Sequence, residues 1–296
     1  MLGIEVDALF GCDPGAGCTS EDVLAALDAY RARGVRHIFP VHVFDNAFGG
    51  AALYNDFFDP GNYLATGAFF TERDCGAEGY RYRLGSPEAT FFASLLGVPP
   101  RPTPVPADGH CNLRGLSTLG ETLIEGLVER GMIIDVDHMS RRMIDEVLNR
   151  VEPQGYPVVA GHTGFLEIAS GARRSEYQRT ADQVRRIRDL GGLVAPILEQ
   201  GTAAEIDYPE AAFRVANTCD ESSRSWAQAY LYAVDEMEGG KFLHAVAIGS
   251  DLNGFIHLPS PRFGDGACEG NASQIEDPAT RVAYPFAAHG SSGSFD

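Results

Sequence analysis

The chain of 296 residues, of which 44% are hydrophobic, is long enough to bury a substantial core. We expect a single domain over residues 1–296, because α/β barrels commonly fill this length as one unit. The formal net charge of −18 excludes nucleic acid as a partner, since phosphate binding needs a basic surface. No apolar run of about 18 residues is present, so we expect no transmembrane segment. The start MLGIEVDALF lacks the charged and apolar regions of a signal peptide. Because the chain is acidic, we expect a protein that acts on small molecules.

Strand and helix patterns alternate along the chain. The apolar run LGIEV precedes a helix pattern over 19–34, which begins with Thr-Ser and ends at a glycine. A strand is expected over 36–43. Further helix patterns cover 117–131, 140–151, 180–192 and 222–237, and they alternate with apolar runs at 132–138, 157–162, 193–198 and 245–251. This alternation predicts a parallel sheet with right-handed crossovers.

The positions of the polar residues favour a barrel over a doubly wound sheet. Glu5, His42, His138, His162 and Asp251 each follow the end of a different apolar run. This is the pattern of the active-site rim of a (β/α)₈ TIM-type barrel. A doubly wound sheet would more typically carry a glycine-rich phosphate loop after its first strand, and CDPGAG does not match GxGxxG. We therefore predict an α/β fold of the (β/α)₈ TIM-barrel type.

A stretch rich in glycine, proline and aromatic residues interrupts the alternation at about 48–112. We interpret it as a long loop insertion within the same domain. Structured loops of this length are often lids or binding loops, although a surface elaboration is the alternative.

The cysteines allow two interpretations. The chain has six, Cys12, Cys18, Cys75, Cys111, Cys219 and Cys268, without a CxxC pair that would indicate a zinc knuckle or a redox motif. Disulfides, especially between Cys75 and Cys111, would place the protein outside the cytoplasm. Cysteines used as small buried hydrophobic residues would carry no such implication. Both interpretations stay open, and we retain an extracytoplasmic or secreted location as the expectation.

A metal site is expected where the strands end. His138 and His162 end neighbouring apolar runs, so parallel strands would bring the two imidazoles side by side. Either histidine alone could be a structural residue, and a lone carboxylate at Glu5 or Asp251 could cap a helix. Together they form a set of nitrogen and oxygen ligands suited to zinc or a similar divalent ion. Such an ion lowers the pKa of a bound water toward about 7 and prepares it to attack an amide carbonyl.

Five sequence blocks resemble, in order, the membrane dipeptidase (renal dipeptidase) family of zinc metallopeptidases in the amidohydrolase superfamily. They are GIE at 3–5, RHIFPVHVFDN at 36–46, GLSTLGETLIEGLVERGMIIDVDHMS at 115–140, PVVAGHTG at 157–164 and AIGSDLNG at 247–254. The resemblance implies zinc-dependent hydrolysis of dipeptides or dipeptide-like amides by a hydroxide that bridges two zinc ions. It also implies that a homodimer can form.

The resemblance assigns a role to each candidate residue. Glu5 corresponds to the carboxylate that bridges the two zinc ions, and His138 and His162 to the ligands that complete one zinc site. Asp251 corresponds to a ligand of the other ion that also shuttles the proton. His42 corresponds to the residue that polarises the scissile carbonyl or stabilises its oxyanion. One of the arginines Arg173 and Arg174 corresponds to the residue that binds the substrate's terminal carboxylate.

The chain also departs from the family pattern. No HxD or HxH precedes Glu5, although the family's first strand carries a His-x-Asp pair that holds one zinc ion. We therefore expect a barrel that lacks the first one or two strands and that holds two zinc ions, one or none. Asp7 could supply a replacement ligand, and a solvated loop aspartate is the alternative. Hydrolysis of another amide or a lactone, or an inactive fragment, are the other functions that the sequence allows.

Overall fold

The computed structural model describes residues 2–200, 215–216, 218–240, 245–252, 258–283, 286–287 and 294–295. Its helices are α1 (Ser20–Ala32), α2 (Phe58–Thr66), α3 (Pro87–Leu95), α4 (Thr118–Glu129), α5 (Arg141–Val151), α6 (Ala181–Asp189) and α7 (Ser223–Met237). Its strands are β1 (Leu2–Ile4), β2 (Val35–Ile38), β3 (Glu72–Asp74), β4 (His110–Asn112), β5 (Ile133–Ile134), β6 (Val159–Phe165), β7 (Gln178–Arg179), β8 (Leu193–Pro196), β9 (Phe286–Ala287) and β10 (Ser294–Phe295). Among these described residues, no helix has the length and apolar character needed to cross a membrane.

The predicted parallel strands are present as two short sheets. One has the order β1-β2-β5 and the other β7-β6-β8. Three isolated parallel bridges, Asp135 with Val159, Val194 with Val246 and Ile197 with Gly249, continue the order from β5 through β6 and β8 to the segment 246–249. The described strands therefore form an open series, and no closed barrel is present among them.

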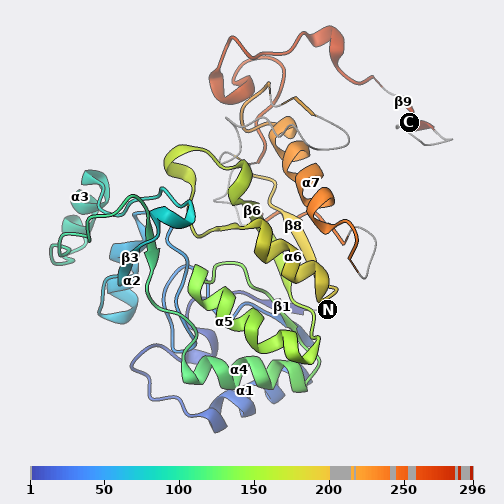
Figure 1. The fold of residues 1–296 in the computed structure, drawn as a ribbon. Coiled ribbons are helices and arrows are strands. Elements are labelled where there is room, and N and C mark those ends of the chain that lie inside the picture. The colour runs from blue at the N-terminus through green and yellow to red at the C-terminus, as the bar shows by residue number, and fades with distance from the viewer. Residues whose placement is uncertain are drawn as a thin grey trace.

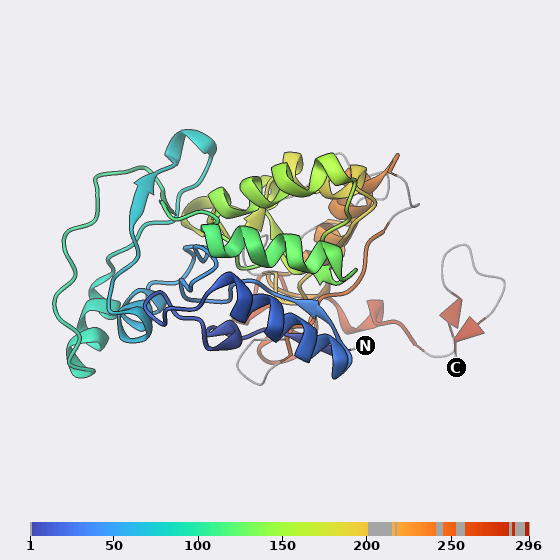
Figure 2. The ribbon, with the colours of Figure 1, turned by 90° about the horizontal axis from the view of Figure 1, so that it is seen from below.

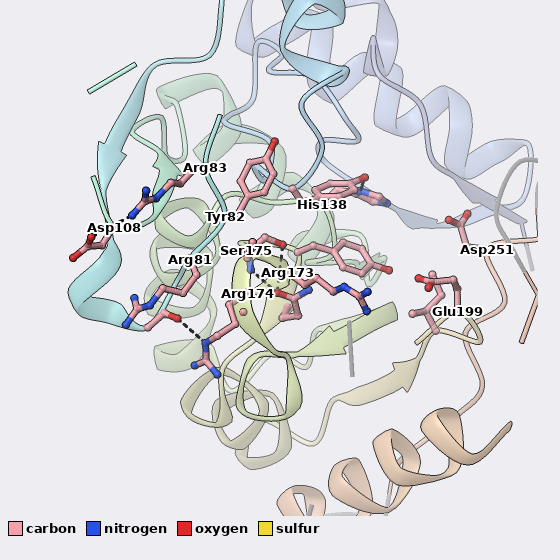
Figure 3. A pocket seen from close by; sticks show the side chains of 17 residues that line it. Arg81, Tyr82, Arg83, Asp108, His138, Arg173, Arg174, Ser175, Glu199 and Asp251 are labelled. Atoms are coloured by element: carbon pink, nitrogen blue, oxygen red, sulfur yellow. Dashed lines mark hydrogen bonds and ion pairs between the residues drawn. The ribbon is translucent and has the colours of Figure 1, made fainter. Parts of the chain in front are cut away.

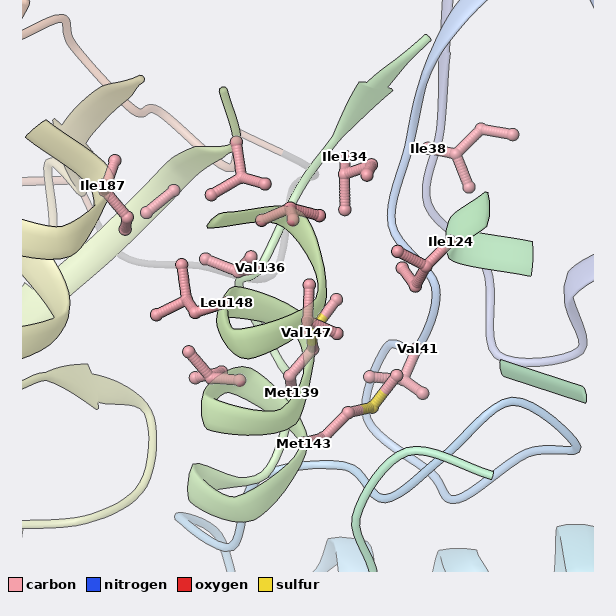
Figure 4. Packing of buried hydrophobic residues seen from close by; sticks show 14 of the residues in the cluster. Ile38, Val41, Ile124, Ile134, Val136, Met139, Met143, Val147, Leu148 and Ile187 are labelled. Carbon is pink, nitrogen blue, oxygen red and sulfur yellow. The ribbon is translucent and has the colours of Figure 1, made fainter. Parts of the chain in front are cut away.

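The predicted helices lie along one side of this strand series (Figures 1 and 2). Thr19 and Thr180 form capping boxes at the starts of α1 and α6, which satisfies amide groups that a helix start leaves unpaired. The main core lies between helices and strands. In Figure 4, Val147 and Leu148 of α5 pack near Val136, which follows β5. A mixed α/β fold is therefore confirmed. Its core supports β5, which precedes the candidate residue His138, and β6, which contains His162.

The segment expected as a long loop contains regular structure. Helices α2 and α3 lie within it, and β3 pairs antiparallel with β4 (Figure 1). A disulfide joins Cys75, directly after β3, to Cys111 in β4, which is the pairing that the disulfide interpretation of the cysteines favoured, and two further disulfides, Cys12–Cys18 and Cys219–Cys268, are present. Sequence patterns underestimated this structure because its helices are short and its strands have three residues each.

A buried carboxylate ties the insertion to the rest of the molecule. Glu176 is almost fully buried and accepts hydrogen bonds from the backbone N–H groups of Leu53, Asn112 and Arg141. Burial raises the pKa of Glu176 to about 7. One side chain thus connects the insertion, the start of α5 and the loop that follows β6.

Candidate active site

Three of the predicted side chains converge at the ends of the strands. Glu5 directly follows β1, His138 lies beyond β5, and His162 lies inside β6. Glu5 Oε1 is 3.0 Å from His138 Nε2 and 3.3 Å from His162 Nε2. The two Nε2 atoms are 2.7 Å apart. His162 was expected at the end of its strand, and it lies instead at an irregularity in the β6–β8 register between Ala160 and Thr163.

The chemistry of this cluster fits a metal ion. Glu5 Oε1 is buried and has no hydrogen-bond partner among the described residues, while two imidazole nitrogens point toward it. Both histidines are buried, and burial lowers the pKa of His138, which favours the neutral ring that a metal ion requires. One carboxylate oxygen and two imidazole nitrogens make a suitable zinc donor set.

Asp251 and His42 extend the cluster into two groups that share Glu5. The ligand atoms of Glu5, His162 and Asp251 all lie within 4.8 Å of one another, and so do those of Glu5, His42 and His138. His138 and Asp251 both have left-handed backbone conformations, with φ of 62° and 42°. Such conformations are strained for residues other than glycine and cluster at functional sites. The structure thus brings all five strand-end residues together.

Residues that the sequence analysis did not single out hold His162 in place. Asp137 Oδ2 accepts a hydrogen bond of 2.7 Å from the His162 N–H, and the Tyr177 hydroxyl donates one of 2.6 Å to the His162 carbonyl. Asp135 Oδ1 accepts from the N–H groups of Asp137 and Gly161. A signal was present in the sequence, because carboxylates at 135 and 137 are unusual in a buried apolar run.

His42 and Asp7 form a pair beside the cluster. His42 Nδ1 is 3.0 Å from Asp7 Oδ1, which also accepts a 3.0 Å hydrogen bond from the Val43 N–H. Burial opposes a charged His42 ring, but the bond to Asp7 and the negative charges of Asp7, Glu5 and Asp251 outweigh it and raise the pKa of His42. Among the described residues, Asp7 belongs to neither group of candidate ligands.

A pocket of about 1040 Å³ opens from this cluster (Figure 3). His138, Asp251 and Glu199 line one part of it, and the insertion contributes Arg81 and Arg83 to another. The insertion therefore forms part of the pocket wall.

The two candidate arginines point in different directions. The Arg174 guanidinium donates to the carbonyl oxygens of Gly79 and Ala169, so it supports the pocket wall. The Arg173 side chain points instead toward the part of the pocket that contains Glu199 and Asp251 (Figure 3). It also lies 3.7 Å from the carboxylate of Glu221. Of the two, Arg173 is the one placed to meet a ligand near the candidate metal site.

Comparison with known proteins identifies the family. The sequence model of the membrane dipeptidase family (peptidase family M19) matches residues 103–260, which is more than half of the chain. The chain therefore belongs to the membrane dipeptidase family, as its sequence blocks predicted. A search among curated proteins gave no match.

Several solved structures are similar to this chain at low sequence identity. A probable dipeptidase from Pseudomonas aeruginosa is 17% identical with a TM-score of 0.48, and the match covers 80% of this chain and 56% of that one. A metallopeptidase from Rhodobacter sphaeroides, solved with a phosphinate mimic of the dipeptide L-Ala-D-Ala, is 15% identical with a TM-score of 0.47, covering 83% and 50%. An amidohydrolase from P. aeruginosa is 15% identical with a TM-score of 0.46, covering 80% and 49%. The chain spans about half the length of these proteins.

Proposed function

We propose that this protein hydrolyses the amide bond of dipeptides or dipeptide-like substrates at a zinc centre. The convergence of Glu5 Oε1 with the Nε2 atoms of His138 and His162 carries this proposal. Membership of the membrane dipeptidase family supports it. The order of parallel strands also supports a TIM-type barrel architecture, with residues 1–296 in one domain.

Each residue of the site has a part in this reaction. Glu5, His138, His162 and Asp251 would hold the zinc. When bound, zinc lowers the pKa of a water ligand toward about 7 and polarises the substrate carbonyl. Asp251 would accept the proton of the attacking water and return it to the departing amine. Arg173 would bind the terminal carboxylate of the substrate through its planar guanidinium group.

The predicted role of His42 places a condition on its protonation. Because Nδ1 faces Asp7, Nε2 can donate a hydrogen bond to an oxyanion only when the ring carries both protons. The carbonyl-polarising role of His42 stays a prediction.

The three disulfides support a location outside the cytoplasm, where such bonds form and persist. We propose an extracytoplasmic or secreted protein on this ground. A homodimer remains a prediction from the family resemblance.

Metal content and dipeptide hydrolysis, measured on the same preparation, test the proposed function. We expect bound zinc, hydrolysis that is lost on chelation and restored by zinc, and loss of both properties in His138→Ala. Asp189→Asn, which changes an exposed carboxylate on α6, is the control and should retain both. A chain that binds no zinc and cleaves no dipeptide would contradict the proposal and support the inactive alternative.

A further inference from the structure

We propose that the insertion forms a subsite for a second anionic group of the substrate, in which Arg81 binds a carboxylate and Arg83 assists it. The inference rests on the proposed function and names its substrate class, which is dipeptides with an acidic C-terminal residue. Asp251 and Glu199 lie at one end of the pocket, near the candidate metal residues, and the two arginines of the insertion lie at the other end (Figure 3).

The segment that carries these arginines is fixed by hydrogen bonds. The N–H groups of Arg81 and Tyr82 donate to the carbonyl oxygen of Arg174, at 2.8 Å and 3.0 Å. The Tyr82 carbonyl accepts a 2.7 Å hydrogen bond from the His110 N–H, and the Tyr82 hydroxyl donates one of 2.6 Å to Asp56. A subsite on such a segment is preorganised, because an anion that binds there has to order few groups.

Arg81 presents the edge of its guanidinium group that can bind a carboxylate through two hydrogen bonds. Its Nη1 atom donates to the carbonyl oxygens of Gly76 and Tyr80, at 2.6 Å each, and these bonds hold the group in one orientation. Among the described residues, its Nε and Nη2 atoms have no hydrogen-bond partner. The N–H groups of these two atoms point in the same direction and match the two oxygens of a carboxylate.

Arg83 adds a second positive charge to the same part of the wall. Among the described residues, its guanidinium forms an ion pair only with Asp108, at 3.3 Å, and the two side chains are 62% and 81% exposed. Such an exposed pair contributes little to stability, so a substrate carboxylate can displace Asp108 as the partner of Arg83. Because the whole chain carries a net charge of −18, these arginines provide a local attraction that the rest of the surface does not.

The location of the subsite indicates which part of the substrate reaches it. Arg173, which is proposed to bind the terminal carboxylate, directly precedes Arg174, whose carbonyl accepts the hydrogen bonds of the Arg81 segment. A dipeptide held by Arg173 therefore places the side chain of its C-terminal residue nearest to Arg81. The pocket volume of about 1040 Å³ is at the upper end of the usual range of about 300–1,000 Å³, so a side chain as long as that of glutamate fits.

Binding of two uncleavable dipeptide analogues tests the proposal without relying on catalysis. The probes are Ala-Glu and Ala-Gln with the amide bond reduced to CH₂–NH, which differ only in the charge of the side chain. Their dissociation constants would be measured by calorimetry on the zinc-loaded chain and its variants. Each variant is judged by the ratio of the two constants, so a general loss of folded protein cancels. Arg185→Gln is the control, because Arg185 is an exposed arginine of α6 that pairs with Glu236 and does not line the pocket.

We expect the wild-type chain to bind the Ala-Glu analogue about tenfold more tightly, as hydrogen bonds between charged groups provide. Arg81→Gln should reduce this preference to about twofold or less, and Arg83→Gln should reduce it in part. Asp108→Asn removes a competing carboxylate and should increase the preference, whereas Arg185→Gln should leave it unchanged. Equal binding of the two analogues by the wild-type chain, or a preference that persists in both Arg81→Gln and Arg83→Gln, would overturn the proposal.

Hydrolysis of Ala-Glu and Ala-Gln by the wild-type chain separates this inference from the proposed function. Cleavage of both dipeptides at the same kcat/KM would support the proposed function and overturn the acidic subsite. A chain that binds the Ala-Glu analogue with the expected preference but cleaves neither dipeptide would retain the subsite and contradict the proposed function. A chain that binds neither analogue would overturn the subsite whatever its activity.

Discussion

Replacing Arg173 by alanine should weaken the binding of substrates that have a free terminal carboxylate. The Arg173 side chain points into the pocket near Asp251, whereas Arg174 donates to backbone carbonyls of the pocket wall (Figure 3). The two adjacent arginines therefore form a matched pair. Arg173 is placed to bind a ligand, and Arg174 stabilises the pocket wall.

The expected magnitude follows from the exposure of the side chain. A hydrogen bond to a charged group contributes about 1.5–3 kcal/mol, which corresponds to about 10- to 150-fold in affinity. The Arg173 side chain is 45% exposed and already lies near Glu221, so the lower part of this range applies. We expect Arg173→Ala to lower kcat/KM by about 10- to 30-fold, mainly through KM.

Steady-state kinetics on a dipeptide and on its C-terminal amide separates the two roles. The loss in Arg173→Ala should appear with the free dipeptide and largely disappear with the amide, which has no carboxylate to bind. Arg174→Ala should affect both substrates equally and should lower the free energy of unfolding by about 1–2 kcal/mol, because two partly buried carbonyl groups lose their hydrogen-bond donor. An equal loss on both substrates in Arg173→Ala, or a carboxylate-dependent loss only in Arg174→Ala, would refute this assignment.

Three further predictions concern stability. Replacing Cys75 and Cys111 by serine should lower the free energy of unfolding by about 4 kcal/mol, and replacing Cys12 and Cys18 by about 2 kcal/mol. The first disulfide closes a longer loop, with a sequence separation of 36 against 6, and so restricts the unfolded chain more. A larger loss for the Cys12–Cys18 pair in urea unfolding would contradict this. The pKa of Glu176 is about 7 in the folded protein, against an ordinary value of 4.5. The protonated side chain therefore contributes fully to the free energy of unfolding below about pH 4.5, and this contribution is lost as the pH rises through 7. The melting temperature of the wild-type protein should therefore fall relative to that of Glu176→Gln as the pH rises over this range. A difference in melting temperature that stays constant with pH would exclude the effect. Gly161→Ala would place a Cβ 2.5 Å from Asp135 Oδ2, so a loss of about 1–3 kcal/mol is expected in thermal unfolding, and an unchanged melting temperature would show that the site can relax.

Much of the fold and the candidate site was predictable because the relevant signals are local. The caps and apolar spacing of α1 and α6 located these helices. Polar residues after apolar runs located Glu5, His138 and Asp251, since the carboxyl ends of parallel strands meet at one edge. These features depend only on neighbouring residues and on the direction of the strands.

The tertiary structure alone decided which side chains act together. Asp7 and His42 are 35 residues apart, and their contact depends on how two loops meet after β1 and β2. Arg173 and Arg174 are adjacent and chemically identical, so only the packing of the insertion against Arg174 separates their roles. Sequence patterns locate helices, strands and the ends at which strands finish. The direction in which a loop side chain points depends instead on the backbone around it and on the distant segments that it contacts.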